Sequence, residues 1–287
     1  MTLVCDRGPF LSCTELLTLS AGDYVVNVAP NAGGRIARFW SRNSRQDLLV
    51  PLGRAGFHAH QWLKAGAFPM LPFTNRFPAH GLRFGGHSAN PENGVDGFAL
   101  HGFGHRIPWT VTAKTPESVV MRVECPADPI QWPWNWSACQ RMELSPTGLR
   151  LTLELFNTGT EDMPASLGWH PYFLVDEEDA DLRIGASHRF ELDQSGTVVD
   201  PCAAIVSATV HRGQTVAFSG WNGRATLSQV AVECEGTTNL VVHRPANGRY
   251  LCLEPVTVLP GLLGANDPLR AGGIMRLSIG CKIIETG

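Results

Sequence analysis

The stretch CQRMELSPTGLRLTLELFN, residues 139–157, carries the clearest secondary-structure signal of the chain. Every second residue from 149 to 155 is leucine, and this alternation places the four leucines on one face of a strand. In the SPTG segment, Pro146 and Gly148 occupy the favoured second and fourth positions of a type I turn. Two strands joined by such a turn predict an antiparallel hairpin that is buried on one side.

Short segments of the same kind recur along the whole chain, whereas long helical periodicity is almost absent. They are rich in Val, Leu, Ile and Phe and are broken by Gly, Pro, Asn and Asp. Examples are YVVNVAP (24–30), WTVTAK (109–114), SVVMRVEC (118–125), LVVHRP (240–245) and IMRLSIGCKI (274–283). Many strands at short spacing predict an all-β fold, either a large antiparallel sandwich or a barrel. Because no repeat, linker or low-complexity segment interrupts the pattern, we expect residues 1–287 to form a single domain.

The composition limits the partners of the protein. The chain of 287 residues is 44% hydrophobic and 17% charged, so it can bury a sizeable core. A net charge of −3 argues against a nucleic acid or an anionic membrane surface as partner. The basic clusters, such as RNSR at 42–45, are too short to form a binding stripe.

The cysteines and the N-terminus predict a cytoplasmic protein with reduced thiols. The eight cysteines are scattered singly, without a C-x-x-C pair. The first residues, MTLVCDRGPFLSC, lack the basic start and apolar run of a signal peptide. No segment approaches 18 uninterrupted apolar residues, the minimum for a membrane-spanning helix.

Residues 51–105 differ from the rest of the chain. They are rich in Gly, Pro, His, Asn and aromatic residues and show little alternation. A stretch of this length without clear secondary structure is usually functional or disordered. Its aromatic content argues against disorder.

The usual cofactor and nucleophile motifs are missing. The sequence contains no G-x-G-x-x-G after a strand, no P-loop, no H-E-x-x-H and no G-x-S-x-G. HAH at 58–60 offers two metal ligands without an obvious third, so loop histidines are the simpler interpretation. DEEDAD at 176–181 does not have the spacing of an EF-hand and is most simply a solvated acidic loop. We predict neither a metal nor a cofactor.

Four segments place polar groups among apolar or turn residues. They are LPFTNRF (71–77), LHGFGHRIPW (100–109), LGWHPYF (167–173) and RYLCLEPVT (249–257). His170 and Glu254 both precede proline, which holds the backbone extended beneath each side chain. Each also has a purely structural alternative: His170 as a packed core histidine, and Glu254 as a solvated strand end or a partner of Arg249.

Together these segments suit proton transfer on a small polar molecule, because they supply an acid, histidines and an arginine. Aromatic side chains beside polar groups suit a sugar ring, which has apolar faces and a rim of hydroxyls. The aromatic patch WPWNW at 132–136 is a candidate wall for such a pocket, with core packing as the alternative.

The ordered set of motifs resembles the aldose 1-epimerases (galactose mutarotases) over nearly the whole chain. It comprises NAGGRIARFW (31–40), FTNRF (73–77), LHGFGH (100–105), GWHPYF (168–173), GWNG (220–223) and CLEPVT (252–257). The resemblance implies the galactose-mutarotase-like fold, a large antiparallel β-sandwich of the supersandwich type. It also implies a cytoplasmic enzyme that acts on free sugars without a cofactor.

The same resemblance implies roles for seven residues. They are Glu254 as general base, His170 as general acid, His101 at the anomeric end of the sugar, Asn75 and Arg76 on sugar hydroxyls, and Tyr172 and Asn222 as further substrate contacts. Asn222 stands where the family pattern has an aspartate. Because Asn-Gly is a strong turn dipeptide, the alternative is that Asn222 only serves a turn.

The expected activity is therefore the interconversion of the α and β anomers of a free aldose by acid–base ring opening and closure. We expect a protonated His170 beside an ionised Glu254, with the carboxylate raising the pKa of the histidine. The expected partner is a monosaccharide, and the protein is expected to be a monomer or a homodimer.

Other functions stay open at the level of sequence. One is a non-catalytic sugar-binding or sensor protein on the same fold. Another is a mutarotase for a phosphorylated or rarer sugar, with Arg38, Arg83 and Arg106 as candidate cations. A glycosidase would need two suitably spaced carboxylates, and the sequence nominates only Glu254.

Overall fold

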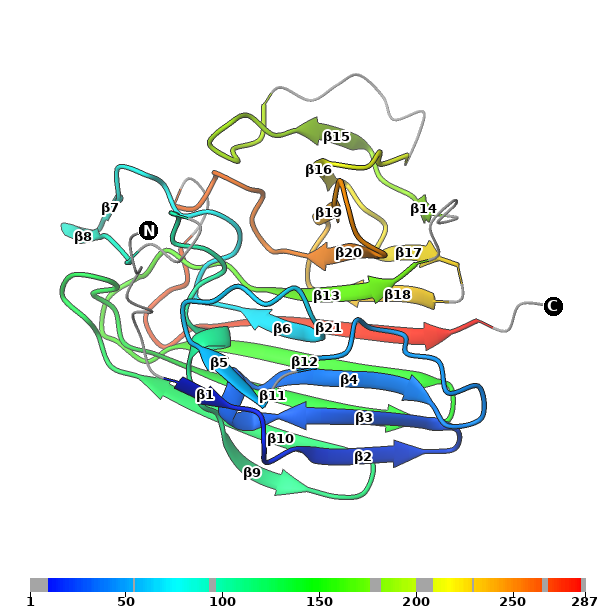
Figure 1. The fold of residues 1–287 in the computed structure, drawn as a ribbon. Helices are drawn as coiled ribbons and strands as arrows, with labels where there is room; N and C mark the ends of the chain where they lie inside the picture. Colours follow the sequence, from blue (N-terminus) through cyan, green and yellow to red (C-terminus); the bar gives the residue numbers. More distant parts are fainter. Residues whose placement is uncertain are drawn as a thin grey trace, which may run out of the picture.

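The computed structural model describes residues 10–53, 55–92, 97–175, 182–199, 209–228, 230–264 and 268–284. Within these ranges the chain forms 21 strands and two short 3-10 helices (Figure 1). Two large antiparallel sheets contain most of the strands, which confirms the predicted all-β sandwich.

The first large sheet has eight strands in the order β14-β17-β18-β21-β12-β11-β10-β9. Their bounds are β9 Thr110–Lys114, β10 Ser118–Cys125, β11 Trp136–Ser145, β12 Gly148–Asn157, β14 Leu182–Ile184, β17 Arg224–Leu227, β18 Val230–Glu235 and β21 Ile274–Ile283.

The second large sheet has nine strands in the order β15-β16-β19-β20-β13-β6-β4-β3-β2. Their bounds are β2 Leu17–Ala21, β3 Tyr24–Ala29, β4 Arg35–Ser41, β6 Ala67–Met70, β13 Gly168–Leu174, β15 His188–Glu191, β16 Gln214–Ser219, β19 Leu240–Arg244 and β20 Tyr250–Pro255. Smaller elements are the strand pairs β1 Phe10–Ser12 with β5 Gly56–His58 and β7 Leu82–Phe84 with β8 His87–Ala89, and the 3-10 helices η1 Pro30–Ala32 and η2 Gly104–Arg106.

Strands β11 and β12 form the hairpin predicted from their alternating leucines. Ser145 pairs with Gly148, which leaves Pro146 and Thr147 at the turn. Gly148 has a φ of +150°, and a Cβ there would lie 2.1 Å from the carbonyl oxygen of Cys281 on β21. Only glycine fits this close approach. The alternating leucines of β12 are buried, as the pattern predicts.

The core lies between the two large sheets. Leu153 of β12 and Ile279 of β21 belong to the same buried cluster as Phe39 of β4 and Phe218 of β16. The three tryptophans of WPWNW (132–136) belong to this cluster too, so that patch packs in the core. The idea that WPWNW walls a sugar pocket is therefore wrong.

The irregular segment 51–105 contains four short strands and η2 in its described part. Phe57, Phe68, Phe73 and Phe77 from this segment are all buried. Strand β6, at the segment's centre, pairs with β13 and contacts β4, so the segment enters the nine-stranded sheet (Figure 1). This places its polar residues beside those of β13.

The thiols of the described cysteines are free: Cys13, Cys125, Cys139, Cys234, Cys252 and Cys281. Cys5, Cys202 and the acidic run 176–181 lie outside the described residues. Searched over the described ranges, the chain has no helix of the length and apolarity that a membrane crossing requires.

Candidate functional site

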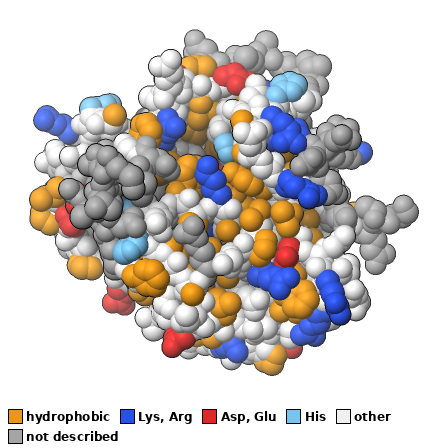
Figure 2. Space-filling view, viewed as in Figure 1, with side chains coloured by type: hydrophobic (Ala, Val, Ile, Leu, Met, Phe, Trp, Pro, Cys, Tyr) orange, Lys and Arg blue, Asp and Glu red, His pale blue; other side chains and the backbone are white. Residues whose placement is uncertain are grey.

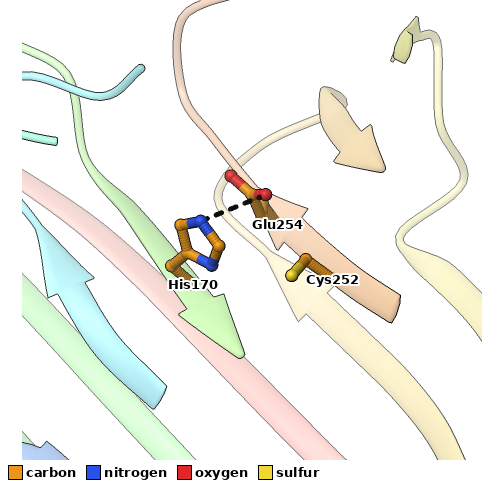
Figure 3. A group of neighbouring side chains, drawn as sticks. All are labelled: His170, Cys252 and Glu254. Carbon is orange, nitrogen blue, oxygen red and sulfur yellow. Dashed lines mark ion pairs between the residues drawn. The ribbon is translucent and has the colours of Figure 1, made fainter. Parts of the chain in front are cut away.

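The register of two neighbouring strands brings His170 and Glu254 together. Tyr172 on β13 lies opposite Cys252 on β20, and an isolated bridge further along keeps this register. His170 therefore lies opposite Glu254, and alternation puts all four side chains on one face. The Nε2 atom of His170 is 3.4 Å from Oε1 of Glu254 (Figure 3). Both side chains are about 2–3% exposed, so Glu254 is not a solvated strand end.

A cavity of about 530 Å³ opens beside this pair. Five of the residues predicted from the sequence line it: Asn75, Arg76, His101, His170 and Glu254. Figure 2, viewed as in Figure 1, shows a face of the molecule on which hydrophobic side chains gather in the middle with Lys and Arg side chains among them. A cavity with apolar walls and a few convergent polar groups is the usual form of a small-molecule site.

Other residues of the cavity wall were not predicted from the sequence: Trp62, Lys64, Phe98, Asp193, Thr215 and His243. Of these, His243 offered a signal, because it interrupts the apolar run of LVVHRP (240–245). It lies opposite Cys252 on the strand next to β20, and its Nδ1 is 2.8 Å from the Thr215 hydroxyl. Lys64 and Trp62 lie in the irregular segment 51–105, whose composition indicates function for the segment but does not single out these two residues.

Two site residues have left-handed backbones. Asn75 has a φ of +59° and His101 a φ of +61°, which is uncommon for residues other than glycine. The His101 N–H donates to the Asn75 carbonyl at 2.9 Å, and Arg76 forms a bridge with Leu100. Gly102 completes the turn, since a Cβ there would lie 2.0 Å from the Leu71 carbonyl. Strained backbones of this kind cluster at functional sites, where surrounding contacts hold them.

Ring contacts fix the orientation of the polar groups. The His101 and His170 rings are perpendicular, with centroids 4.8 Å apart. The guanidinium of Arg76 stacks on the Phe98 ring at 4.1 Å and donates to the Gln194 carbonyl at 3.0 Å. These contacts hold the two imidazole rings and the Arg76 guanidinium in defined positions at the cavity wall.

Tyr172 does not line the cavity, in contrast to the expectation that it contacts substrate. Its ring stacks on His170 with centroids 4.6 Å apart and planes within 14°. The Trp62 indole N–H donates to the Tyr172 hydroxyl at 2.8 Å and helps to cover it. Tyr172 is 1% exposed, so its role here is to hold the His170 ring in place.

Asn222 lies away from the cavity, and the expectation that it lines the pocket is wrong. The segment 220–223 connects β16 to β17, which belong to different sheets, so it is not the turn of a hairpin. The Asn222 side-chain oxygen accepts a hydrogen bond from the Arg224 N–H at 3.0 Å. The backbone N–H of Asn222 donates to the Gly185 carbonyl at 2.9 Å. Asn222 therefore stabilises the connection between β16 and β17 through these two hydrogen bonds.

Replacement of Asn222 by Asp is accordingly expected to change kcat/KM for glucose or galactose by less than about threefold. The carboxylate keeps an acceptor for the Arg224 N–H, and the side chain does not reach the cavity. Anomer exchange measured by NMR on both proteins tests this. A gain of tenfold or a changed sugar preference would return Asn222 to the binding site.

The candidate cations named from the sequence do not line the cavity. Arg38 is paired with Asp47, Arg106 is buried and donates to the Leu100 carbonyl at 3.1 Å, and Arg83 lies on β7. The cations of the cavity wall are Lys64 and Arg76.

Asp193 is a second carboxylate in the cavity wall, beside Glu254. It already accepts hydrogen bonds from the Ser195 hydroxyl at 2.6 Å and from the backbone N–H groups of Ser195 and Thr197. These bonds, with the Ser195 hydroxyl first, lower the pKa of Asp193. Asp193 is thus an ionised group that holds its own loop, unlike Glu254.

Burial controls the protonation of the central pair. It lowers the pKa of His170 well below its ordinary value, with smaller contributions from His101 and His243. Burial also raises the pKa of Glu254 to about 8. The expectation that the carboxylate raises the histidine pKa is therefore corrected, because desolvation outweighs it. Both shifts favour the uncharged pair, with the proton on Glu254.

The neighbouring imidazoles are uncharged as well. Burial, and then the charge of Arg106, lowers the pKa of His101 to about 3. The same two causes lower the pKa of His105 well below its ordinary value. Burial, and then the charge of Lys64, lowers the pKa of His243 to about 4.

These shifts predict that the protein loses stability in mild acid. His101, His105, His170 and His243 bind protons near pH 6.5 when unfolded but not when folded, so their contribution is lost as the pH falls below 6.5. The raised pKa of Glu254 acts in the opposite direction between about pH 4.3 and 8 and offsets one of the four. The free energy of unfolding should fall by roughly 3–4 kcal/mol per pH unit between about pH 6 and 5.

Urea unfolding at a series of pH values measures this slope. His105→Asn should reduce it by the equivalent of one proton. A free energy of unfolding that stays constant from about pH 7 to 5 would contradict the proposed state of the buried imidazoles.

Comparison with known proteins supports the assignment of fold and family. The chain resembles a galactose mutarotase-like protein from Lactobacillus casei with a TM-score of 0.78, 17% identity and coverage of 94% of this chain and 100% of the other. It resembles the galactose 1-epimerase from Lactobacillus acidophilus with a TM-score of 0.73, 14% identity and coverage of 98% and 99%. It is 26% identical over 272 residues to the uncharacterized protein YphB of Escherichia coli K12, covering 85% of this chain and 89% of that protein.

The fold and its cavity define a β-sandwich protein of the galactose-mutarotase-like type. The family model for aldose 1-epimerase matches residues 15–238. The chain belongs to the aldose 1-epimerase family, as the ordered motifs predict.

Proposed function

We propose that this protein is an aldose 1-epimerase that interconverts the anomers of a free aldose without a cofactor. The observation that carries the proposal is the 3.4 Å contact between His170 and Glu254 in the wall of the cavity. An imidazole and a carboxylate at this distance give a site one group to accept a proton and another to donate one.

In ring opening, the Glu254 carboxylate removes the proton of the C1 hydroxyl. The C1–ring-oxygen bond breaks as the C1 carbonyl forms, and protonated His170 gives its proton to the ring oxygen. Rotation about C1–C2 and the reverse steps then produce the other anomer. Each proton transfer is worth roughly 10²–10⁴ in rate.

One proton shared by the pair is sufficient for this cycle. Opening begins with a charged pair and ends with protonated Glu254 and neutral His170. This uncharged form is the one that burial favours, as the raised pKa of Glu254 and the lowered pKa of His170 indicate. Closure, or proton transfer across the 3.4 Å contact, restores the charged form.

The remaining cavity groups are placed to hold a sugar. His101, Asn75 and Arg76 supply donors and acceptors for hydroxyls, and His101 lies against His170. The Trp62 and Phe98 side chains line the cavity and supply apolar surface for the apolar sides of the sugar ring. We propose a monosaccharide as substrate on these grounds.

Polarimetry on freshly dissolved α-glucose and α-galactose, extended by NMR to a panel of aldoses, tests the activity. Acceleration of mutarotation by the natural chain supports the proposal. Saturable sugar binding without acceleration on any aldose would instead make this a sugar-binding protein. Aldose phosphates belong in the panel, because Lys64 and Arg76 line the cavity.

The pH profile of kcat/KM should be bell-shaped, because the pair must hold one proton. Above a pH of about 8 the pair loses that proton, in line with the raised pKa of Glu254. The pair takes up a second proton only at a pH well below 6.5, because the pKa of His170 is lowered. The limbs belong to the coupled pair. Rates corrected for uncatalysed mutarotation measure the profile, and a flat profile between about pH 5 and 9 would contradict it.

A further inference from the structure

We propose that Cys252 completes a binding site for zinc, or another thiophilic divalent metal ion, with His170 and Glu254, and that metal bound there inhibits the protein. Cys252 and Glu254 are two residues apart on β20 and point to the same side as His170 (Figure 3). One nitrogen, one sulfur and one oxygen of these side chains lie within 4.8 Å of one another. Over the described ranges, no other His, Cys, Asp or Glu side chains gather in threes this closely.

The donor set selects the kind of metal. Imidazole, thiolate and carboxylate are the three ligand types of zinc sites in proteins, whereas magnesium and calcium bind through oxygen. Thiolate also selects against the hard cations among competing divalent ions. Cys252 has no hydrogen-bond or ion-pair partner among the residues described here, so its sulfur is not committed elsewhere.

The distances fit a zinc centre after small side-chain rotations. Zinc–ligand bonds of about 2.0–2.3 Å imply ligand atoms about 3.5 Å apart in a tetrahedron. The His170–Glu254 separation of 3.4 Å already matches this edge. Separations of up to 4.8 Å must shorten by about 1 Å, which rotation of Cys252 about χ1 and of Glu254 about χ1 and χ2 would provide.

The position of the site gives it an open side. His170 and Glu254 line the cavity, whereas Cys252 is fully buried behind them. A metal bound by all three would have protein on one side and the cavity on the other, as in zinc sites with three protein ligands and a water molecule. Binding would release the thiol proton and the proton of the His170–Glu254 pair to solvent.

Inhibition follows because the metal would occupy the two groups that move protons. This consequence rests on the proposed function, whereas metal binding itself does not. Cys252 has no place in the ring-opening steps. Replacement of its thiol is therefore expected to weaken metal binding without abolishing catalysis.

The test uses cobalt(II) as a spectroscopic substitute for zinc. Metal-free protein is titrated with cobalt chloride, and the thiolate-to-cobalt charge-transfer band in the near ultraviolet is recorded. We expect one equivalent to bind to the natural chain and zinc to displace it. The band should be lost in Cys252→Ala but kept in Cys281→Ala, a matched control in which a buried thiol of the other sheet is removed.

Activity provides a second measurement. Cys252→Ala should keep mutarotase activity within a few-fold, and the zinc concentration that halves its activity should rise at least about tenfold. Absence of the band in the natural chain, or equal zinc sensitivity of both proteins, would overturn the proposal. The cobalt experiment still decides metal binding if no aldose is turned over. Cys252→Ser, which keeps the side-chain volume, replaces the Ala variant if that variant does not fold.

Discussion

Glu254→Gln is expected to lower kcat by roughly 10²–10⁴ while the chain folds as before. The amide keeps the shape of the side chain and a hydrogen-bond acceptor, but it cannot take the proton of the C1 hydroxyl. The contact to His170 would remain, so the loss would report proton transfer and not packing. Mutarotation followed by polarimetry at saturating sugar measures the effect.

The free energy of unfolding of Glu254→Gln shows whether its loss of activity comes from the lost proton transfer or from a disturbed fold. Because burial raises the pKa of Glu254 to about 8, this group favours the unfolded state increasingly as the pH rises from about 4.3 to 8. The glutamine side chain would carry no charge, so Glu254→Gln should be at least as stable as the natural chain at pH 8 and above. Such a gain in stability at the expense of activity is typical of functional sites.

Asp193→Asn provides the matched control, since it changes the other described carboxylate of the cavity wall. Asp193 holds its own loop through Ser195 and Thr197, so its replacement should alter KM more than kcat. Near-natural turnover in a folded Glu254→Gln protein would remove Glu254 from the role of base. An equal fall of kcat in Glu254→Gln and Asp193→Asn would also contradict the role of Glu254 as the base.

Local patterns in the sequence were sufficient to predict the type of fold. Alternation over 149–155 and the Pro-Gly turn predict β11, β12 and their burial, because side-chain period and turn chemistry are properties of a few adjacent residues. The identity of neighbouring strands is not local. That β13 lies between β6 and β20 follows from packing of the whole sandwich, and only this order brings His170 to Glu254.

The errors at the site have the same origin. Tyr172 shares the face of His170, but the cover provided by Trp62, 110 residues away, decides that it is buried. Asn222 follows a turn-like pattern, yet the flanking strands enter different sheets and carry it away from the cavity. His243 reaches the site because β19 pairs with β20. The motif resemblance identified Asn75 and His101, whereas alternation could not, since their left-handed backbones interrupt any regular strand.

His170→Asn is expected to lower kcat by roughly 10²–10⁴ with a smaller change in KM. The proton that His170 donates is needed on the way to the transition state, so its loss affects turnover more than binding. The variant also loses ring contacts to Tyr172 at 4.6 Å and to Phe68 at 4.8 Å. These contacts are worth about 1–3 kcal/mol of unfolding free energy together, so a control for packing is required.

His105→Asn is that control, because the two histidines flank the same ring. The His105 ring lies 4.9 Å from Phe68, is also buried, and has a pKa lowered by the same burial, yet it does not line the cavity. His105→Asn should lose comparable stability but keep kcat within a few-fold, and its pH profile should retain both limbs. His170→Asn should lose the alkaline limb, and its residual activity should rise with pH through the raised pKa of Glu254 near 8, because Glu254 must then be ionised to act as the base. If both variants lost kcat equally, activity would depend on the packing around Phe68, and His170 would not be the acid.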